Sequence, residues 1–128
     1  MKILLANLEP NGYSTLSESL ERKTTFHFPM GLGIIAAVIK NAGFRFNVYD
    51  SYVDGSTKGF IENINQSIPD IIMLSSFLGN YSYRFLKNIA NEIKTINESI
   101  IIIVGGPMAN AIPELLISKT LIDFVVKG

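Results

Sequence analysis

The sequence predicts a three-layer α/β fold, in which helices cover both faces of a parallel sheet. The first observation is a run of apolar residues without alternation, at Ile71–Leu74 and again at Ile100–Val104. A strand of this kind expects no water on either face, as in the middle of a parallel sheet. The second observation is that segments with helical periodicity separate five candidate strands. Strands that alternate with helices indicate a parallel sheet with right-handed crossovers.

The amino-terminal third provides one strand, one long connection and one helix. Lys2–Leu8 is apolar at four successive positions, so we expect both faces of this strand to be buried. The polar connection Glu9–Phe28 is long for a compact domain, and such loops tend to be functional or partly ordered on their own. Pro29 suits the first turn of a helix, and Gly43 suits a left-handed cap at its end. The buried face of this helix repeats at i, i+3, i+4 and i+7, at Leu32, Ile35, Ala36 and Ile39.

The middle of the chain repeats this alternation. Phe44–Asp50 alternates apolar and polar residues, so it predicts a less buried strand. Ser56 or Thr57 can cap the next helix, which stops at Pro69. The strand that begins at Asp70 follows directly.

The carboxyl-terminal part contains two more helices and two more strands. Asn80 caps a helix whose apolar residues recur at helical spacing. Ile100–Val104 is the most apolar strand of the chain, and a short helix begins near Pro113. Ile122–Val126 closes the chain as the fifth strand.

These elements define the expected topology. Of the two common orders of doubly wound sheets, 2-1-3-4-5 suits five strands and places the Asp70 strand in the centre. We therefore expect a single domain over residues 1–128 with a flavodoxin-like (Rossmann-like) five-stranded parallel sheet.

The composition excludes several classes of function. Charges balance to zero, whereas a nucleic-acid binder needs a basic surplus to neutralise phosphates. No run of about 18 apolar residues predicts a membrane span, and Ile3–Ala6 is too short for a signal peptide, so we expect a cytoplasmic protein. With no cysteine and with His27 as its one histidine, the chain offers no disulfide, thiolate nucleophile or Cys/His zinc site. We therefore expect no catalytic residue and no metal ligand in this chain, and any chemistry to come from a bound cofactor or another domain.

Small residues follow two neighbouring strands of the expected order, at their carboxyl ends. Ser75 and Ser76 end the Asp70 strand, and Gly105 and Gly106 end the next one. Each pair alone is also explained by a turn or a helix cap. Together they share one rim of the sheet, and ligands of open α/β sheets bind at this rim.

A second pattern offers an alternative site. Gly31–Ala36 matches Gly-x-Gly-x-x-Ala, and Asp50 stands 19 residues after Gly31 at the end of a strand, as in dinucleotide-binding domains. The fingerprint glycines normally follow the first buried strand directly, whereas here Glu9–Phe28 intervenes. Glycines that let the helix approach the sheet closely explain the pattern more simply, and a dinucleotide site stays open as the alternative.

The ordered set of motifs resembles cobalamin-binding domains. Domains of the methionine-synthase type show Asp-x-His-x-x-Gly after the first strand, Ser-x-Leu after the third and Gly-Gly after the fourth. Ser75–Phe77, or Ser76–Leu78 in shifted register, is similar to the second element, and Gly105–Gly106 follows at the family's spacing. Asn7–Gly12 stands at the first element and keeps only Gly12.

The whole chain is similar to the amino-terminal domain of B12-binding radical SAM enzymes. Pro29–Gly33 resembles the opening of their first helix, and Val104–Pro107 resembles their Val-Gly-Gly-Pro. Asp123–Gly128 resembles the Asp-Phe-Val-Val-Lys-Gly that closes their domain. The resemblance covers essentially all 128 residues and implies a B12-binding domain cut from a longer radical SAM protein.

The resemblance implies a cofactor, a site and a partner. Cobalamin would bind with its nucleotide tail at the rim of the sheet, and a downstream domain would bind a 4Fe–4S cluster and S-adenosylmethionine for methyl transfer or radical rearrangement. Glu9 replaces the motif's histidine, so we expect no histidine on the lower face of cobalt and no cobalt bond from His27. A degenerate scaffold that docks a catalytic domain without cofactor stays open as an alternative. The site residues that the resemblance implies are Gly12, Ser75, Ser76, Phe77, Leu78, Gly105, Gly106 and Pro107.

Overall fold

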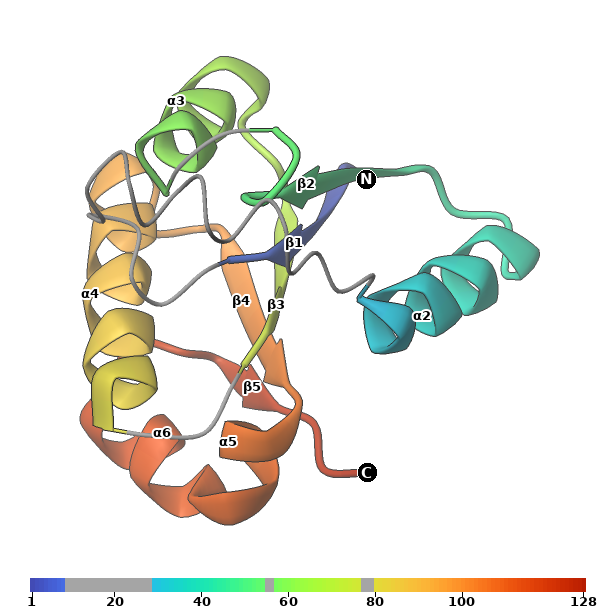
Figure 1. Cartoon of the computed structure of the whole chain (residues 1–128). Helices are drawn as coiled ribbons and strands as arrows, with labels where there is room; N and C mark the ends of the chain where they lie inside the picture. The colour runs from blue at the N-terminus through green and yellow to red at the C-terminus, as the bar shows by residue number, and fades with distance from the viewer. Residues whose placement is uncertain (9–28, 55–56, 77–79) are drawn as a thin grey trace.

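The computed structural model describes residues 1–8, 29–54, 57–76 and 80–128. Five strands of this part form one parallel sheet in the order β2-β1-β3-β4-β5, which confirms the predicted flavodoxin-like topology (Figure 1). The strands are β1 (Ile3–Asn7), β2 (Phe46–Asp50), β3 (Ile71–Ser75), β4 (Ile101–Gly105) and β5 (Phe124–Val125). The helices are α2 (Met30–Asn41), α3 (Thr57–Ser67), α4 (Asn80–Ile96), α5 (Pro107–Ala111) and α6 (Pro113–Lys119).

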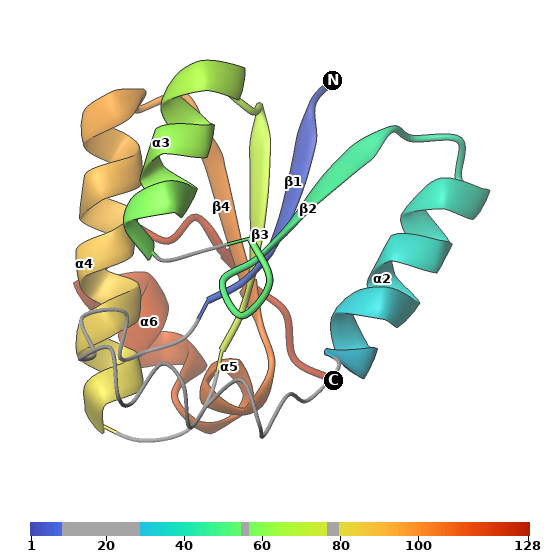
Figure 2. The same ribbon diagram turned by 45° about the horizontal axis from the view of Figure 1, so that its top comes forward.

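The helices cover the two faces of the sheet unequally. Helices α3, α4 and α6 lie on one face, and α2 lies on the other (Figures 1 and 2). The larger apolar cluster lies on the side of the three helices and includes Phe60, Ile72 and Leu116. The smaller cluster joins Leu5 of β1 to Leu32 of α2. Successive residues of β1 belong to the two clusters in turn, which is why this strand has an unbroken apolar run.

Strand β2 begins at Phe46 instead of the expected Phe44, because the preceding helix uses Phe44 in its cap. The N–H of Gly43 donates to the carbonyl oxygen of Lys40 at 3.0 Å, and the N–H of Phe44 donates to that of Ile39 at 3.1 Å. This pair of hydrogen bonds is a Schellman motif, which needs a left-handed residue at its turn. Gly43 supplies it with φ +85°, so the predicted glycine cap is confirmed.

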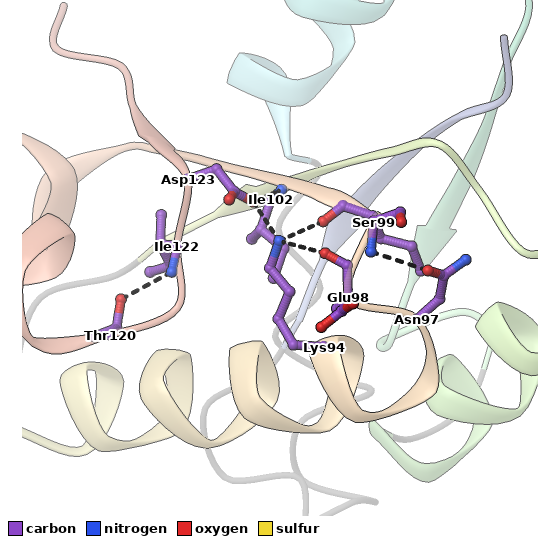
Figure 3. Close-up of polar contacts among 9 residues, drawn as sticks. Lys94, Asn97, Glu98, Ser99, Ile102, Thr120, Ile122 and Asp123 are labelled. Atoms are coloured by element: carbon purple, nitrogen blue, oxygen red, sulfur yellow. Dashed lines mark hydrogen bonds and ion pairs between the residues drawn. The ribbon is translucent and has the colours of Figure 1, made fainter.

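Strand β5 is shorter than the expected Ile122–Val126, because the side chain of Asp123 takes a place in the ladder. The Asp123 carboxylate accepts the N–H of Ile102 at 2.7 Å and the ammonium of Lys94 at 2.8 Å (Figure 3). Lys94 also donates to the carbonyl oxygen of Ile100 at 2.7 Å. This network ties α4 to the start of β4 and to Asp123, the residue that precedes β5.

Two local predictions need correction. Of the two candidate caps of α3, Ser56 lies outside the described residues, and Thr57 begins the helix but does not cap it, since its buried hydroxyl has no hydrogen-bond partner among the described residues. Helix α5 was not predicted; Pro107 occupies its first turn, and α6 begins at Pro113 as expected. No helix in the described part of the chain has the length and apolar character that crossing a membrane requires.

Candidate functional site

The carboxyl ends of four neighbouring strands meet in one row. Asp50 pairs with Asn7, Asn7 with Ser75, and Ser75 with Gly105. The Asn7 amide donates to the Asp50 carboxylate at 3.3 Å, and the same carboxylate accepts the N–H of Tyr52 at 3.1 Å. Asn7 and Asp50 are buried. Their polar groups therefore satisfy one another on the β2 side of the row, and the candidate site lies on the β3–β4 side.

A cavity of about 450 Å³ opens beside Ser75 and Gly105. It lies between the first turn of α2, the ends of β3 and β4 and the residues after β5. Cofactor pockets usually have volumes of this order and walls that are mainly apolar. The lining residues are Gly31, Leu32, Ile35, Met73, Leu74, Ser75, Ile103, Gly105, Gly106, Val126 and Gly128.

The two serines at the end of β3 have different roles. The Ser76 hydroxyl donates to the carbonyl oxygen of Gly105 at 2.6 Å and accepts the N–H of Ala109 at 3.4 Å. The backbone N–H of Ser76 donates to the same carbonyl oxygen at 3.0 Å. Ser76 thus fastens the end of β3 to β4 and α5. Ser75 lines the cavity, and its hydroxyl forms no hydrogen bond within the described ranges of the chain.

The two glycines at the end of β4 also have different roles, one structural and one that leaves space in the cavity. A Cβ at Gly106 would lie 2.7 Å from the carbonyl oxygen of Ser76, and Gly106 has φ +97°. Only glycine tolerates both the close approach and the left-handed backbone. A Cβ at Gly105 would have the carbonyl oxygen of Val126, 4.0 Å away, as its nearest neighbour. The missing side chain of Gly105 therefore leaves space in the cavity and relieves no clash.

Residues after β5 form one wall of the cavity. The N–H of Val126 donates to the carbonyl oxygen of Val104 at 2.9 Å. The backbone of Gly128 and the side-chain amide of Asn110 exchange two hydrogen bonds of 3.0 Å. These bonds hold the carboxyl terminus on the face of the sheet that α2 covers (Figure 2).

The structure brings part of the predicted site together. The cavity is lined by Ser75, Gly105 and Gly106. Ser76 instead forms a hydrogen bond to Gly105 away from the cavity, and Pro107 lies in the first turn of α5. The other residues named for the site or the cobalt face lie outside the described residues: Glu9, Gly12, His27, Phe77 and Leu78.

The sequence reasoning missed the apolar walls, such as Met73 and Ile103, because they carry the same signal as ordinary core residues. The sequence analysis connected Gly31 with a dinucleotide site and with a close approach of its helix to the sheet, and both interpretations need correction. Gly31 and Gly33 lie inside α2 and not in a turn before it, so the dinucleotide pattern lacks its structural context. A Cβ at Gly31 would meet no atom of the described residues within 4 Å, so this glycine is not required for close approach of α2 to the sheet.

A second hollow, of about 370 Å³, lies between β2 and α3 and has mostly polar walls. Burial, and then the negative charges of Asp54 and Glu62, raise the pKa of the Tyr49 phenol there. Within the described residues no three His, Asp or Glu side chains gather closely enough to hold a metal ion. The hollow is lined by Val48, Tyr49, Asp54, Gly59, Glu62, Asn63 and Gln66.

Comparison with known proteins supplies independent information. The family model of the B12 binding domain matches residues 21–128. Among solved structures, the chain is similar to a novel cobalamin-binding protein from Desulfitobacterium hafniense DCB-2, with a TM-score of 0.68 and 19% sequence identity. The match covers 99% of this chain and 52% of that one, so this chain spans about half of its length. At this identity the likeness shows the fold. No curated protein matches the sequence.

Proposed function

The chain belongs to the family of B12-binding domains, and we propose that the cavity beside Ser75 and Gly105 receives the nucleotide tail of cobalamin. One observation carries the proposal. A hydroxyl without a partner among the described residues and an open glycine position lie side by side at the rim of the sheet. Ligands of open α/β sheets bind at this rim.

The residues present fit such a tail in size and polarity. The cavity volume of about 450 Å³ lies in the range of small-molecule sites. The tail ends in an aromatic base, which gains free energy when it leaves water for apolar walls such as Met73 and Ile103. The Ser75 hydroxyl can donate a hydrogen bond to a ring nitrogen of that base.

The chain's own part in this function is to bind and orient the cofactor. Ser76 and Gly106 hold the ends of β3 and β4 together and so position Ser75 and Gly105. When bound, cobalamin supplies a cobalt centre for methyl transfer or radical chemistry. The walls of the cavity keep water away from the base of the tail.

A titration of hydroxocobalamin into the protein tests this function. The absorption spectrum should shift to the base-off form, because the base has left the cobalt for the cavity. We propose no cobalt bond from His27, so His27→Ala should show the same shift. No spectral change at saturating cofactor would contradict the function and favour a scaffold that docks without cofactor. A shift lost only in His27→Ala would make this histidine the lower cobalt ligand.

We also propose that the domain presents cobalamin to a downstream radical SAM domain of the same polypeptide. An exposed apolar surface supports this proposal. Met30, Ile34 and Val38 form one stripe of α2 and are 71%, 64% and 62% exposed, and Phe124 of β5 is 57% exposed. A helix that is apolar on all sides is usually buried, and exposed apolar patches mark interaction surfaces. Asn110 holds Gly128 on the face of the sheet that α2 covers, which is the face that carries this surface.

The reading frame after Gly128 tests the downstream domain. We expect a continuation that contains Cys-x-x-x-Cys-x-x-Cys, the ligand set of the 4Fe–4S cluster that activates S-adenosylmethionine. A stop codon at this point, or a continuation without the three cysteines, would contradict the radical SAM assignment and leave the cobalamin site as a separate carrier.

A further inference from the structure

We propose that Asn110 is a positioning residue of the cavity, whose side-chain amide fixes one wall of the cavity before a ligand binds. This wall is the segment of residues 126–128, which follows β5. The inference rests on the proposed function, since it concerns the ligand of the same cavity.

The position of this wall sets the space above Gly105. A Cβ at Gly105 would have the carbonyl oxygen of Val126, 4.0 Å away, as its nearest neighbour among the described residues. Val126 and Gly128 line the cavity on this side, and Gly31 in the first turn of α2 lines it as well. A ligand that fills the space above Gly105 therefore contacts the wall.

The two ends of the wall are held in different ways. The N–H of Val126 donates to the carbonyl oxygen of Val104 at 2.9 Å, which continues the ladder between β4 and β5. The N–H of Gly128 donates to the side-chain oxygen of Asn110 at 3.0 Å, and the carbonyl oxygen of Gly128 accepts the side-chain N–H of Asn110 at 3.0 Å. Gly128 forms no other hydrogen bond within the described ranges of the chain. The far end of the wall thus depends on one side chain.

Asn110 suits this role in its chemistry and in its place on α5. A side-chain amide carries both a donor and an acceptor, so it can pair with both backbone groups of one residue. The backbone N–H of Asn110 donates to the carbonyl oxygen of Gly106 at 3.1 Å, and the N–H of Ala109 donates to the Ser76 hydroxyl at 3.4 Å. Helix α5 is therefore tied to the ends of β3 and β4. Asn110 is exposed and is not among the residues that line the cavity, so it acts through Gly128.

The expected effect follows from the conformational entropy of the wall. Without the Asn110 amide, Gly128 becomes ordered only when a ligand binds. Fixing the backbone of one residue at that moment weakens binding by about 5- to 30-fold. A wall that is already fixed avoids this cost, which is the advantage of preorganisation.

Asn110→Ala tests the inference through two measurements on the full-length protein. Hydrogen exchange at the N–H of Gly128 should become faster in the free protein, and cobalamin should slow it again. Calorimetric titration should show a Kd for cobalamin that is about 5- to 30-fold higher. Cobinamide, a corrinoid without the nucleotide tail, should bind as it does to the wild-type protein, because it leaves the cavity empty. The melting temperature should stay the same, since the two lost hydrogen bonds are exposed.

Asn97→Ala is the matched control, because it removes an asparagine side chain that also bonds to the backbone, but near the start of β4. Its side-chain oxygen accepts the N–H of Ser99 at 2.9 Å (Figure 3). This variant should keep the wild-type Kd for cobalamin and the exchange rate of Gly128.

Three results would overturn the inference alone: unchanged exchange at Gly128 in Asn110→Ala, an unchanged Kd for cobalamin, or equal weakening of cobalamin and cobinamide. The last result would make Asn110 a general structural residue. No binding of cobalamin to the wild-type protein would instead overturn the proposed function.

Discussion

Replacing Gly105 with valine should abolish most cobalamin binding while leaving the fold intact. A Cβ at this position meets no atom of the described residues closer than 4.0 Å, and β-branched residues suit a strand better than glycine does. The free energy of unfolding should therefore stay constant or rise. The three added carbons occupy space that the base of the tail needs. At about 0.8 kcal/mol for each CH₂-sized group no longer buried, the loss is about 2.4 kcal/mol, or roughly a 50-fold higher Kd.

Gly106→Ala provides the contrast at the neighbouring position. Its Cβ would lie 2.7 Å from the carbonyl oxygen of Ser76, and the left-handed backbone costs a non-glycine residue about 1–2 kcal/mol. The melting temperature should fall by on the order of 5–10 °C, measured by circular dichroism. Calorimetric titration measures the affinity of each variant. Wild-type affinity in Gly105→Val would refute the location of the tail, and equal destabilisation by both changes would make Gly105 a structural glycine.

Three further predictions concern stability. Ser76→Ala should lower the free energy of unfolding by about 1–3 kcal/mol in urea denaturation, because the hydroxyl that fastens β3 to Gly105 is lost; a change below about 0.5 kcal/mol would contradict this role. Asp123→Ala should also lower the free energy of unfolding by about 1–3 kcal/mol, since the N–H of Ile102 loses its acceptor. Asp123→Asn keeps an acceptor oxygen, so its free energy of unfolding should fall less. Burial and two neighbouring carboxylates raise the pKa of the Tyr49 phenol. The protonated phenol therefore contributes to the free energy of unfolding below about pH 10, and this contribution is lost as pH rises through the raised pKa. Tyr49→Phe should flatten the alkaline decline in stability, and an unchanged decline would argue against this role of Tyr49.

The sheet could be predicted because burial on both faces leaves a direct record in the sequence. The apolar runs at Ile71–Leu74 and Ile100–Val104 identify β3 and β4, and the strand count suits the order that the structure has. The ends of elements were less accessible, because hydrogen bonds between distant residues set them. Phe44 serves the cap of α2 instead of β2, and Asp123 replaces a backbone acceptor with its side chain.

The rim of the sheet could be predicted, but the roles of the residues on it could not. Ser75 and Ser76 are identical in chemistry, and alternation along β3 places them on opposite faces. Which face holds the cavity depends on the unequal cover by the helices, which no local pattern records. Gly105 and Gly106 likewise differ only in backbone angle and in what a Cβ would meet. The apolar wall at Met73 was invisible because it has the same composition as a core.

The central claim is that the cavity binds the nucleotide tail, and cobinamide tests it most directly because this corrinoid lacks the tail. Calorimetric titration of the protein with cobalamin and with cobinamide compares the two under the same conditions. Burial of an aromatic base is worth about 1.5–3 kcal/mol, so cobinamide should bind at least about tenfold more weakly, and Gly105→Val should reduce that difference. Equal affinities for cobalamin and cobinamide in the wild-type protein would contradict the claim.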